Sequence, residues 1–432
     1  MKSTSDIKGR TRATGEEKGG VICVLFSLCC VLSSGPLIAQ QGSSIPSGGA
    51  SAPVGISSDS IVVGPFLFSP SLQLTWQDRD NIFYTPDNEV RDQLIIARAQ
   101  LLFEVPINES HVYFSYSPQY TDYRTYQLVD NWSHFFDVGG SFLFSSGLAL
   151  RANYNYIIGN LETREVDPGG ELFYGDTRFV KNFAAVSADY WFSNRDGLFV
   201  DFSWTDLDHS DPQLFYDYTS IAAGLGWLHQ LSPNLVMDAR YGVIDFDAHD
   251  NIYQSNGFRD SLSNIVTLGF RGQLSPVVAT EGRVGYQTIQ YDLQPGDPPI
   301  EDFSGFIANG FISWDMAHGS VLSFDILHSP YPSNYADNAN YVATGAGLTY
   351  SLNRGSIFGQ AHGRIQNNDY DLPDPVSNEL RSDDIFSLGL GLGVRFGDHM
   401  SLFGSYLFEE RESLYQYSYT VNIFTLGLVV GF

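Results

Sequence analysis

Residues 386–396 read FSLGLGLGVRF. Every second residue is large and apolar, from Phe386 to Phe396, and the residues between them are serine, glycine or arginine. A strict period of two is the pattern of a β-strand with one apolar face and one small or polar face. A tilted strand needs about 9–11 residues to cross a bilayer. This stretch therefore predicts a membrane-crossing β-strand.

The same period recurs along the chain, for example in LALRANYNY at 148–156 and LFVDFSWT at 198–205. Short turns alternate with longer polar loops between such segments. The turns fall at 105–110, 145–147, 193–197, 231–234, 274–277, 316–320, 352–356 and 396–400, and the loops near 78–92, 121–132, 160–177, 206–217, 245–260, 292–303, 330–340, 368–384 and 409–418. Eight turns and nine loops predict 18 strands, with 16 as the alternative count.

An even number of antiparallel strands, with short turns on one side and long loops on the other, is typical of outer-membrane barrels of Gram-negative bacteria. We therefore predict an all-β, up-and-down transmembrane β-barrel over residues 65–432, with short periplasmic turns and long acidic external loops. The competing fold is a soluble β-sandwich, whose core would have to bury faces that carry Arg and Asp. In lipid, only helices and closed barrels satisfy every backbone group.

The N-terminus has the order of a secretory signal peptide. Basic residues from Lys2 to Lys18 precede the apolar run VICVLFSLCCVL at 21–32, and small residues lead to Ala39. The alternative is a membrane anchor, but Gly35-Pro36 interrupts the run before about 20 apolar residues accumulate. We predict a signal peptide at 1–39 and a low-complexity periplasmic lead-in at 40–64.

All three cysteines lie in that N-terminal segment, so the processed chain would contain none. Disulfides, thiolate metal sites and cysteine nucleophiles are then excluded. The net charge is −26, and removal of 1–39 takes away five basic and three acidic side chains. A chain with this large a negative charge is not expected to bind the phosphates of nucleic acid.

The period of two also assigns charged residues to the inward face of the barrel. The predicted pore-lining residues are Arg98, Glu104, Asp137, Arg151, Lys181, Asp189, Asp201, Asp238, Arg240, Arg271, Glu281, Arg283, Asp315, Asp325, Arg364 and Arg395. Eight are basic and eight acidic, so the predicted wall is nearly neutral, while the nine loops hold 34 acidic and seven basic residues. The wall charges have two interpretations: a selectivity lining, or structural Arg–Asp pairs across neighbouring strands, which we favour for most of them.

Aromatic residues near the strand ends, among them Tyr216, Tyr218, Tyr291 and Tyr370, suit interfacial girdles. The last strand, YTVNIFTLGLVVGF, has a pattern that resembles the signal read by the outer-membrane barrel assembly machinery. Its alternating residues are Phe424, Leu426, Leu428, Val430 and Phe432.

Catalytic and metal-binding motifs are weak. TDLDHSD at 205–211 gathers Asp206, Asp208, His209, Ser210 and Asp211, but one loop that carries every member of a cluster is poor support for catalysis. Asp78, Asp80 and Glu89 match a calcium loop, yet Ile82 and Phe83 stand where an oxygen ligand and a glycine are needed. We predict no enzyme, no cofactor and no metal.

The first hairpin resembles a known family. DRDNIFYTPDNEVRD at 78–92 is similar to the first loop of outer-membrane β-barrel porins found with exopolysaccharide operons, and the matching positions are Asp80, Asn81, Phe83, Asn88 and Asp92. The resemblance implies an outer-membrane channel-like protein that serves surface polysaccharide export, and it carries over no catalytic residue.

The predicted function is thus a porin-like channel for hydrophilic solutes. The alternatives are a non-conducting barrel that acts as a surface scaffold or adhesin, and an outer-membrane enzyme that modifies lipid or glycan. The expected partners are outer-membrane lipid and lipopolysaccharide, the barrel assembly machinery and polysaccharide-export components.

Overall fold

The computed structural model describes residues 60–431, except 128–129, 161–170, 172–176, 211–214, 250–256, 294, 296–299, 318, 335–337 and 375–376. The predicted signal peptide, most of the lead-in and Phe432 therefore lie outside the described residues. The long strands are β2 (Phe66–Arg79), β3 (Asp92–Ile107), β4 (Ser110–Tyr123), β5 (Asn131–Leu143), β6 (Leu148–Asn160), β7 (Arg178–Trp191), β8 (Asp196–His209), β9 (Tyr218–Ser232), β10 (Leu235–Ala248), β11 (Ser261–Ser275), β12 (Val278–Tyr291), β13 (Phe303–Met316), β14 (Ser320–Pro332), β15 (Asn340–Arg354), β16 (Ile357–Pro373), β17 (Leu380–Phe396), β18 (Met400–Glu412) and β19 (Tyr419–Gly431).

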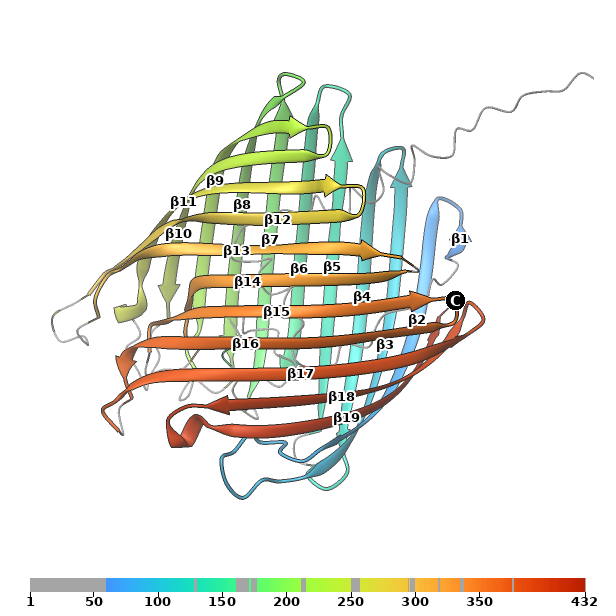
Figure 1. Cartoon of the computed structure of the whole chain (residues 1–432), viewed down its shortest axis with the longest axis vertical. Coiled ribbons are helices and arrows are strands. Elements are labelled where there is room, and N and C mark those ends of the chain that lie inside the picture. The colour runs from blue at the N-terminus through green and yellow to red at the C-terminus, as the bar shows by residue number, and fades with distance from the viewer. Residues whose placement is uncertain are drawn as a thin grey trace, which may run out of the picture. The chain divides into compact units, whose positions relative to one another are not determined.

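These strands form a closed antiparallel barrel (Figure 1). Each strand pairs with the next one in the chain, and β19 closes the ring on β2 over the register from Ile423↔Arg79 to Gly431↔Ser71. The predicted 18-stranded barrel is confirmed. Each predicted short turn joins the expected pair of strands, and at the first of them Asn108 adopts a positive φ of 56°.

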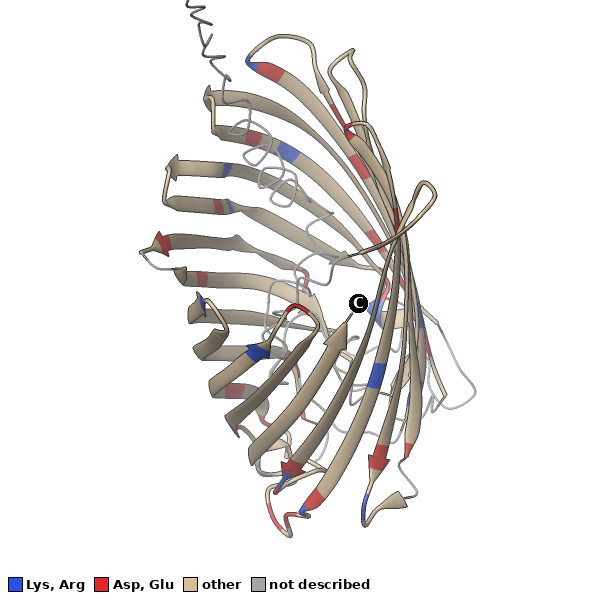
Figure 2. Ribbon diagram, turned by 90° about the vertical axis from the view of Figure 1, so that its right-hand side faces the viewer, with Lys and Arg blue, Asp and Glu red and all other residues tan. Residues whose placement is uncertain are grey.

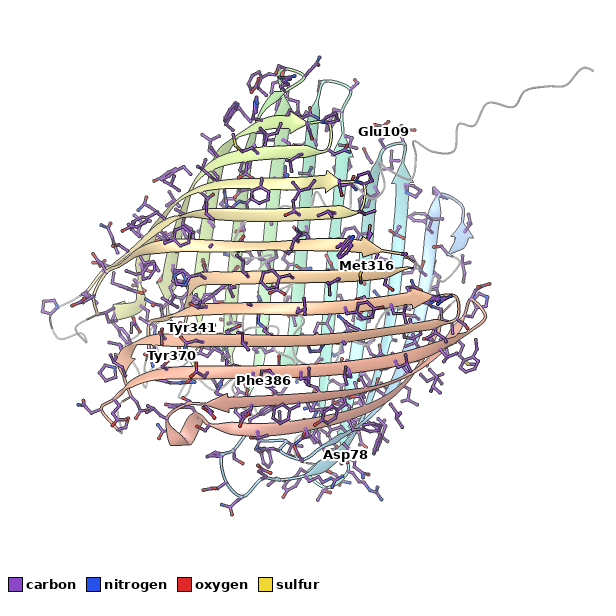
Figure 3. All side chains as sticks on the ribbon, viewed as in Figure 1. Asp78, Glu109, Met316, Tyr341, Tyr370 and Phe386 are labelled. Carbon is purple, nitrogen blue, oxygen red and sulfur yellow. The ribbon has the colours of Figure 1, made fainter. Side chains whose placement is uncertain are left out.

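The strands run further toward the long loops than the sequence predicted. β16 continues to Pro373 and β17 begins at Leu380, although 368–384 was expected to be a loop. Most side chains in this region are polar. The outward positions there are no longer regularly apolar, because these strand ends need not face hydrocarbon. In Figure 3, Tyr370 lies at this end of the barrel, whereas Glu109 and Met316 mark the short-turn end.

A short strand precedes the barrel. β1 (Ile61–Val63) pairs with the start of β2, from Ile61↔Phe68 to Val63↔Phe66. Since β19 pairs with β2 only from Ser71 onward, β1 occupies the edge of β2 that lies beyond the end of β19. The end of the predicted lead-in is therefore part of the sheet.

The two faces of the wall differ in chemistry. Outward residues such as Val266, Leu268 and Leu392 are 58–61% exposed in the isolated chain, whereas the inward Thr267 between the first two is only 2% exposed. Phe424 and Leu426 of the predicted assembly signal also belong to the outward face, at 44% and 46%. An outward apolar band is what a lipid-facing barrel requires.

Within the described residues, no helix has the length and hydropathy needed to cross a membrane.

Candidate functional site: the inner wall and the external mouth

The registers place all sixteen predicted pore-lining residues on the inward face. This face is defined by buried positions such as Thr267 and Ser405, and it alternates with the exposed apolar face. Nine of the sixteen join ion pairs: Arg151 with Asp189 at 3.0 Å, Arg271 with Asp189 at 3.9 Å, Arg283 with Asp238 at 3.2 Å, Arg364 with Asp325 at 2.8 Å, and Arg240 with Asp201.

Three of these pairs span a whole strand. In the register, Asp238 on β10 stands opposite Gly269 on β11, which stands opposite Arg283 on β12. The two charged side chains meet above the glycine, and a Cβ there would lie 2.7 Å from an Asp238 carboxylate oxygen. The same register joins Asp325 and Arg364 over Gly347. Asp201 and Arg240 meet over Gly224 in a diagonal version, because Arg240 stands two register positions away from Gly242, the β10 residue opposite Gly224. We call these three Asp–Gly–Arg units the wall straps.

The strap side chains are largely buried. The Arg240 and Asp201 side chains are 7% and 5% exposed, and only Asp325 reaches 32%. A buried charge is costly unless a partner and hydrogen bonds satisfy it. Each strap therefore lets the wall carry a guanidinium and a carboxylate at low net charge.

The other predicted lining residues have different neighbours. The Arg98 guanidinium lies 4.7 Å over the Phe135 ring, and the Arg395 guanidinium donates to Asn353 at 2.8 Å. Asp137 accepts from the Tyr113 hydroxyl at 3.2 Å. Glu104, Lys181, Glu281 and Asp315 stand on the same face outside the five ion pairs.

A second charged cluster lies at the external end, and sequence reasoning missed it. Arg381 forms an ion pair with Asp383 at 2.7 Å, and Arg411 lies 3.6 Å from the same carboxylate. These side chains are at most 1% exposed, although both arginines fell in predicted solvent-facing loops. Figure 2 shows acidic residues at many strand ends. The spacing of Arg381 and Asp383 could have indicated this cluster, because residues two apart in a strand lie on the same face.

Loops from distant hairpins meet at the external mouth. The Tyr216 hydroxyl donates to the Ser333 carbonyl, and Arg259 Nε donates to the Asn338 carbonyl at 2.9 Å. Glu171 accepts from Ser333 Oγ and from the Asn334 amide, each at 2.7 Å. These bonds join the connections after β6, β8 and β10 to the connection after β14. Since β6 and β14 are eight strands apart in a ring of 18, the bonds run across the mouth.

The interfacial role predicted for four tyrosines is wrong. Tyr216, Tyr218 and Tyr370 are 2–8% exposed, and Tyr291 shares an inward register position with Ser261. The rings of Tyr370 and Tyr341 pack against each other with their centroids 5.3 Å apart. Both residues are labelled in Figure 3. These rings fill the inner side of the mouth.

The family-motif loop is an anchor for the barrel closure. The Asn81 side chain is fully buried, donates to the Thr85 and Thr420 carbonyls at 2.8 and 3.1 Å, and accepts from the Thr85 amide at 3.1 Å. The Asp80 carboxylate accepts from the Asn422 amide at 2.7 Å and from its side chain at 2.6 Å. Both residues therefore tie the first loop to β19, across the seam that closes the ring.

The rest of the motif ties the first loop to the second. Asp92 accepts from the amides of Thr125 and Tyr126 at 3.0–3.1 Å, and Phe83 meets the Tyr126 ring edge-on at 5.4 Å. Asn88 supplies a turn with φ of 53°. Asp78, the first residue of the calcium-like pattern, forms an ion pair with Arg91 instead.

The TDLDHSD segment is divided by its strand. Asp206 and Asp208 belong to the outward face of β8 and His209 to the inward face, while Asp211 lies outside the described residues. His209 contacts Asp217 in the following loop; burial alone would raise the pKa of Asp217, but the hydrogen bonds and charge of His209 hold it below its ordinary value. In the part of the chain that the structure describes, no group of three or more His, Cys, Asp or Glu residues is placed to hold a metal ion.

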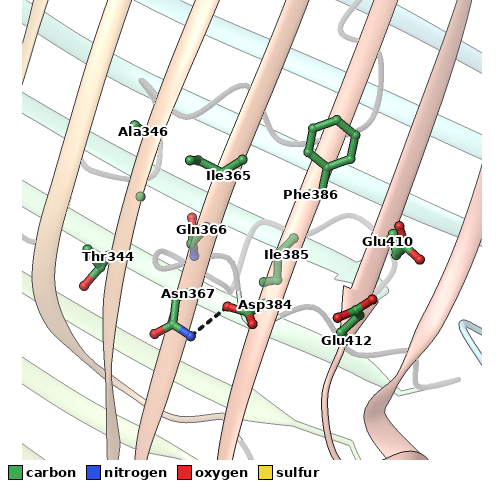
Figure 4. A pocket seen from close by; sticks show the side chains of 11 residues that line it. Thr344, Ala346, Ile365, Gln366, Asn367, Asp384, Ile385, Phe386, Glu410 and Glu412 are labelled. Carbon is green, nitrogen blue, oxygen red and sulfur yellow. Dashed lines mark hydrogen bonds between the residues drawn. The ribbon is translucent and has the colours of Figure 1, made fainter.

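A groove of 540 Å³ lies on the outward wall, across β15 to β18 (Figure 4). Its lining includes the apolar Ile365 and Phe386 and the acidic Asp384, Glu410 and Glu412. Because Ile365 and Phe386 belong to the exposed apolar face, the groove faces away from the lumen and is not the channel.

Several solved outer-membrane protein structures are similar to this chain at low sequence identity. No curated protein sequence matches the chain. Among solved structures, OccAB3 from Acinetobacter baumannii matches with 9% identity and a TM-score of 0.48, covering 86% of this chain and 100% of its own. The outer membrane protein opdK from Pseudomonas aeruginosa matches with 8% identity and a TM-score of 0.46, covering 84% and 99%. A bacterial polysaccharide outer membrane secretin matches with 10% identity and a TM-score of 0.32, covering 84% and 98%.

The family comparison covers the barrel and the end of the lead-in. The model of the family described as "Putative beta-barrel porin 2" matches residues 52–432, which is most of the chain. This match agrees with the closed 18-stranded fold and the apolar outward band. The chain therefore belongs to this porin family and is a porin-like β-barrel of the outer membrane.

Proposed function

We propose that this barrel passes neutral, hydroxyl-rich solutes, and that its physiological cargo is an exported polysaccharide. The observation that carries the proposal is the pairing of the wall charges by the three straps and by Asp189. A wall whose charges neutralise one another neither traps nor repels an uncharged chain. A barrel of about 16–18 strands is wide enough for an aqueous channel unless loops fill it.

The remaining inward positions support this class of solute. Amide side chains stand at Gln100, Gln119, Asn153, Asn155 and Asn309, on the face that carries the straps. Amides donate and accept hydrogen bonds, as sugar hydroxyls do, and they add no charge. The resemblance of the first loop to porins of exopolysaccharide operons supports the polysaccharide part of the proposal.

The direct test is reconstitution into planar bilayers and into vesicles loaded for swelling assays. We expect step conductances, entry of neutral oligosaccharides, and a modest cation preference in a salt gradient, because the acidic residues gather at the external loops. Clear anion preference would contradict the acidic rim as the charge filter. Exclusion of monosaccharides by protein that gives clear step conductances would contradict the proposed cargo class.

A second candidate is a non-conducting surface scaffold, and the bonds across the mouth favour it. Closed traces from folded protein, together with closed traces from variants that remove those bonds, would select this candidate.

A further inference from the structure

The β14–β15 hairpin leaves the barrel wall before it ends. The ladder between β13 and β14 stops at Ala308↔His328. β14 nevertheless stays paired with β15 as far as Pro332↔Asn340, and β13 stays paired with β12 as far as Phe303↔Ile289. The sheet is therefore split between β13 and β14 over the last four or five residues. In Figure 1 the two strands diverge at this end.

The sequence SPYP at 329–332 explains the split. Proline has no N–H group, so a strand that contains it loses a ladder hydrogen bond. Pro330 and Pro332 are two residues apart, so both missing donors belong to the same edge of β14. That edge cannot continue a regular ladder with β13, while the opposite edge remains paired with β15.

Burial shows where the split part lies. In the wall, buried and exposed residues alternate, because one face meets lipid. In the described arms of this hairpin, 329–334 and 338–343, residues of both faces are buried: Ser329, Pro330 and Tyr331 follow one another, as do Asn340 and Tyr341. Protein covers both sides of the arms, which places them inside the mouth.

Side chains from other hairpins hold the arms there. The Tyr216 hydroxyl binds the Ser333 carbonyl, and Arg259 binds the Asn338 carbonyl. The Arg259 guanidinium also lies 4.6 Å over the Tyr216 ring and is part of a side chain only 1% exposed. Burial raises the pKa of the Tyr216 phenol, so the hydroxyl keeps the proton that it donates.

We infer that these two arms form the constriction that sets the largest solute the barrel admits, and that Tyr216 and Arg259 are the residues that position it. The inference rests on the channel function proposed above. The arms retain the β15–β16 ladder on one side, so they stay attached to the wall when their contacts across the mouth are lost. Loss of those contacts therefore widens the mouth without opening the barrel.

The test uses two kinds of variant, read by single-channel conductance and by the size of polyethylene glycol that still enters the pore. Tyr216→Phe removes one hydrogen bond and keeps the ring. We expect the wider level to be occupied about fivefold more often, the factor that one net hydrogen bond is worth. The Pro330→Thr/Pro332→Thr variant restores two donors toward β13, and we expect it to raise the polymer cut-off.

A reversible lock makes the test independent of folding. The chain has no cysteine after Cys30, so the pair Tyr216→Cys/Ser333→Cys can be joined by a reducible bis-methanethiosulfonate linker without side reactions. We expect a low cut-off when linked and a raised one after reduction, on the same protein molecules. The matched control is Phe83→Cys/Tyr126→Cys, which joins the first external loop to the second; linkage there should leave the cut-off unchanged.

The outcomes separate the two proposals. If no variant conducts in any state, the channel function is wrong. If the proteins conduct but linked and reduced Tyr216→Cys/Ser333→Cys share one cut-off, the channel stands and the constriction lies elsewhere. An equal response in the Phe83→Cys/Tyr126→Cys control would also overturn the assignment to these arms.

Discussion

The wall straps predict a sharp difference between two glycines that face each other. Gly224 and Gly242 are paired in the register of β9 and β10 and both point inward. A Cβ on Gly224 would lie 2.6 Å from Arg240 Nε and Nη2 and 2.7 Å from an Asp201 oxygen. A Cβ on Gly242 would meet nothing closer than 3.6 Å. Gly224→Ala therefore pushes against a buried ion pair, and Gly242→Ala is its matched control.

The size of the effect follows from what the ion pair can do. If Arg240 and Asp201 shift and stay paired, the cost is that of overpacking, about 1–3 kcal/mol. If they separate, each becomes an uncompensated buried charge, and breaking such a pair costs about 3–5 kcal/mol. We expect Gly224→Ala to lower the free energy of unfolding by about 2–4 kcal/mol. Gly242→Ala has room for its methyl group and should leave that free energy unchanged or raise it by less than about 1 kcal/mol.

The assay is reversible urea unfolding in phosphatidylcholine vesicles, followed by tryptophan fluorescence. A double-mutant cycle then isolates the strap. In an Asp201→Ala/Arg240→Ala background the space above Gly224 is empty, so the added methyl group should cost little. If Gly224→Ala is no worse than Gly242→Ala, or if its full cost persists in that background, the strap is not what requires glycine at this position.

Three further predictions concern the seam, one wall strap and the N-terminus. Asn81→Ala should destabilise the barrel by about 1–3 kcal/mol in the same assay, because buried backbone groups of loop and β19 lose their partner; Asn88→Gly, at a positive φ, should be nearly neutral. Arg364→Gln removes the guanidinium that pairs with Asp325, whose side chain is 32% exposed, and should shift the reversal potential in a salt gradient toward stronger cation preference. Asp325→Asn should shift it the other way. N-terminal sequencing of membrane-extracted protein should begin at Gln40; a start at Met1 would contradict signal-peptide cleavage.

Strand number and side-chain facing were predictable from the sequence because both are local. A period of two assigns Leu388, Leu390 and Leu392 to one face whatever they later contact, and short turns separate one strand from the next. The inward positions of Asp201 and Arg240 followed from the same rule. The ion pair between them could not be predicted in this way, because it depends on the registers of two strand pairs and on a glycine in the strand between them.

The mouth was less predictable, for a physical reason. Where strands leave the bilayer, the lipid no longer imposes an apolar outward face, so the alternation that reveals a strand disappears. Arg381 and Arg411 then looked like loop charges, although both are buried against Asp383. The sequence SPYP at 329–332 predicted the start of a loop. The prolines alone did not predict that this segment would lose its pairing with β13 and keep its pairing with β15.

The aromatic girdle also depends on which face of the strand a residue occupies, and not only on how near it is to the strand end. Tyr241 and Tyr286 lie outward, 50% and 52% exposed, and their hydroxyls bind Asn264 and Ser304 on the neighbouring strands. In each case the partner is displaced by two register positions toward the external loop. Such tyrosines mark the level at which the outer face changes from hydrocarbon to polar surroundings. The sequence prediction chose girdle residues by their proximity to a strand end. It therefore included Tyr216 and Tyr370, whose side chains lie on the inner side of the barrel.

Charge and size are consequently separable in this barrel. The straps neutralise most of the wall, so discrimination by sign falls to the acidic rim and to Asp325, the strap carboxylate that is most exposed. Discrimination by size falls to the arms held by Tyr216. If this division is right, Arg364→Gln moves the reversal potential and leaves the polymer cut-off alone, while Tyr216→Phe does the opposite. A single variant that moved both would mean that one constriction performs both tasks, and the neutral wall would then have no role in selecting the cargo.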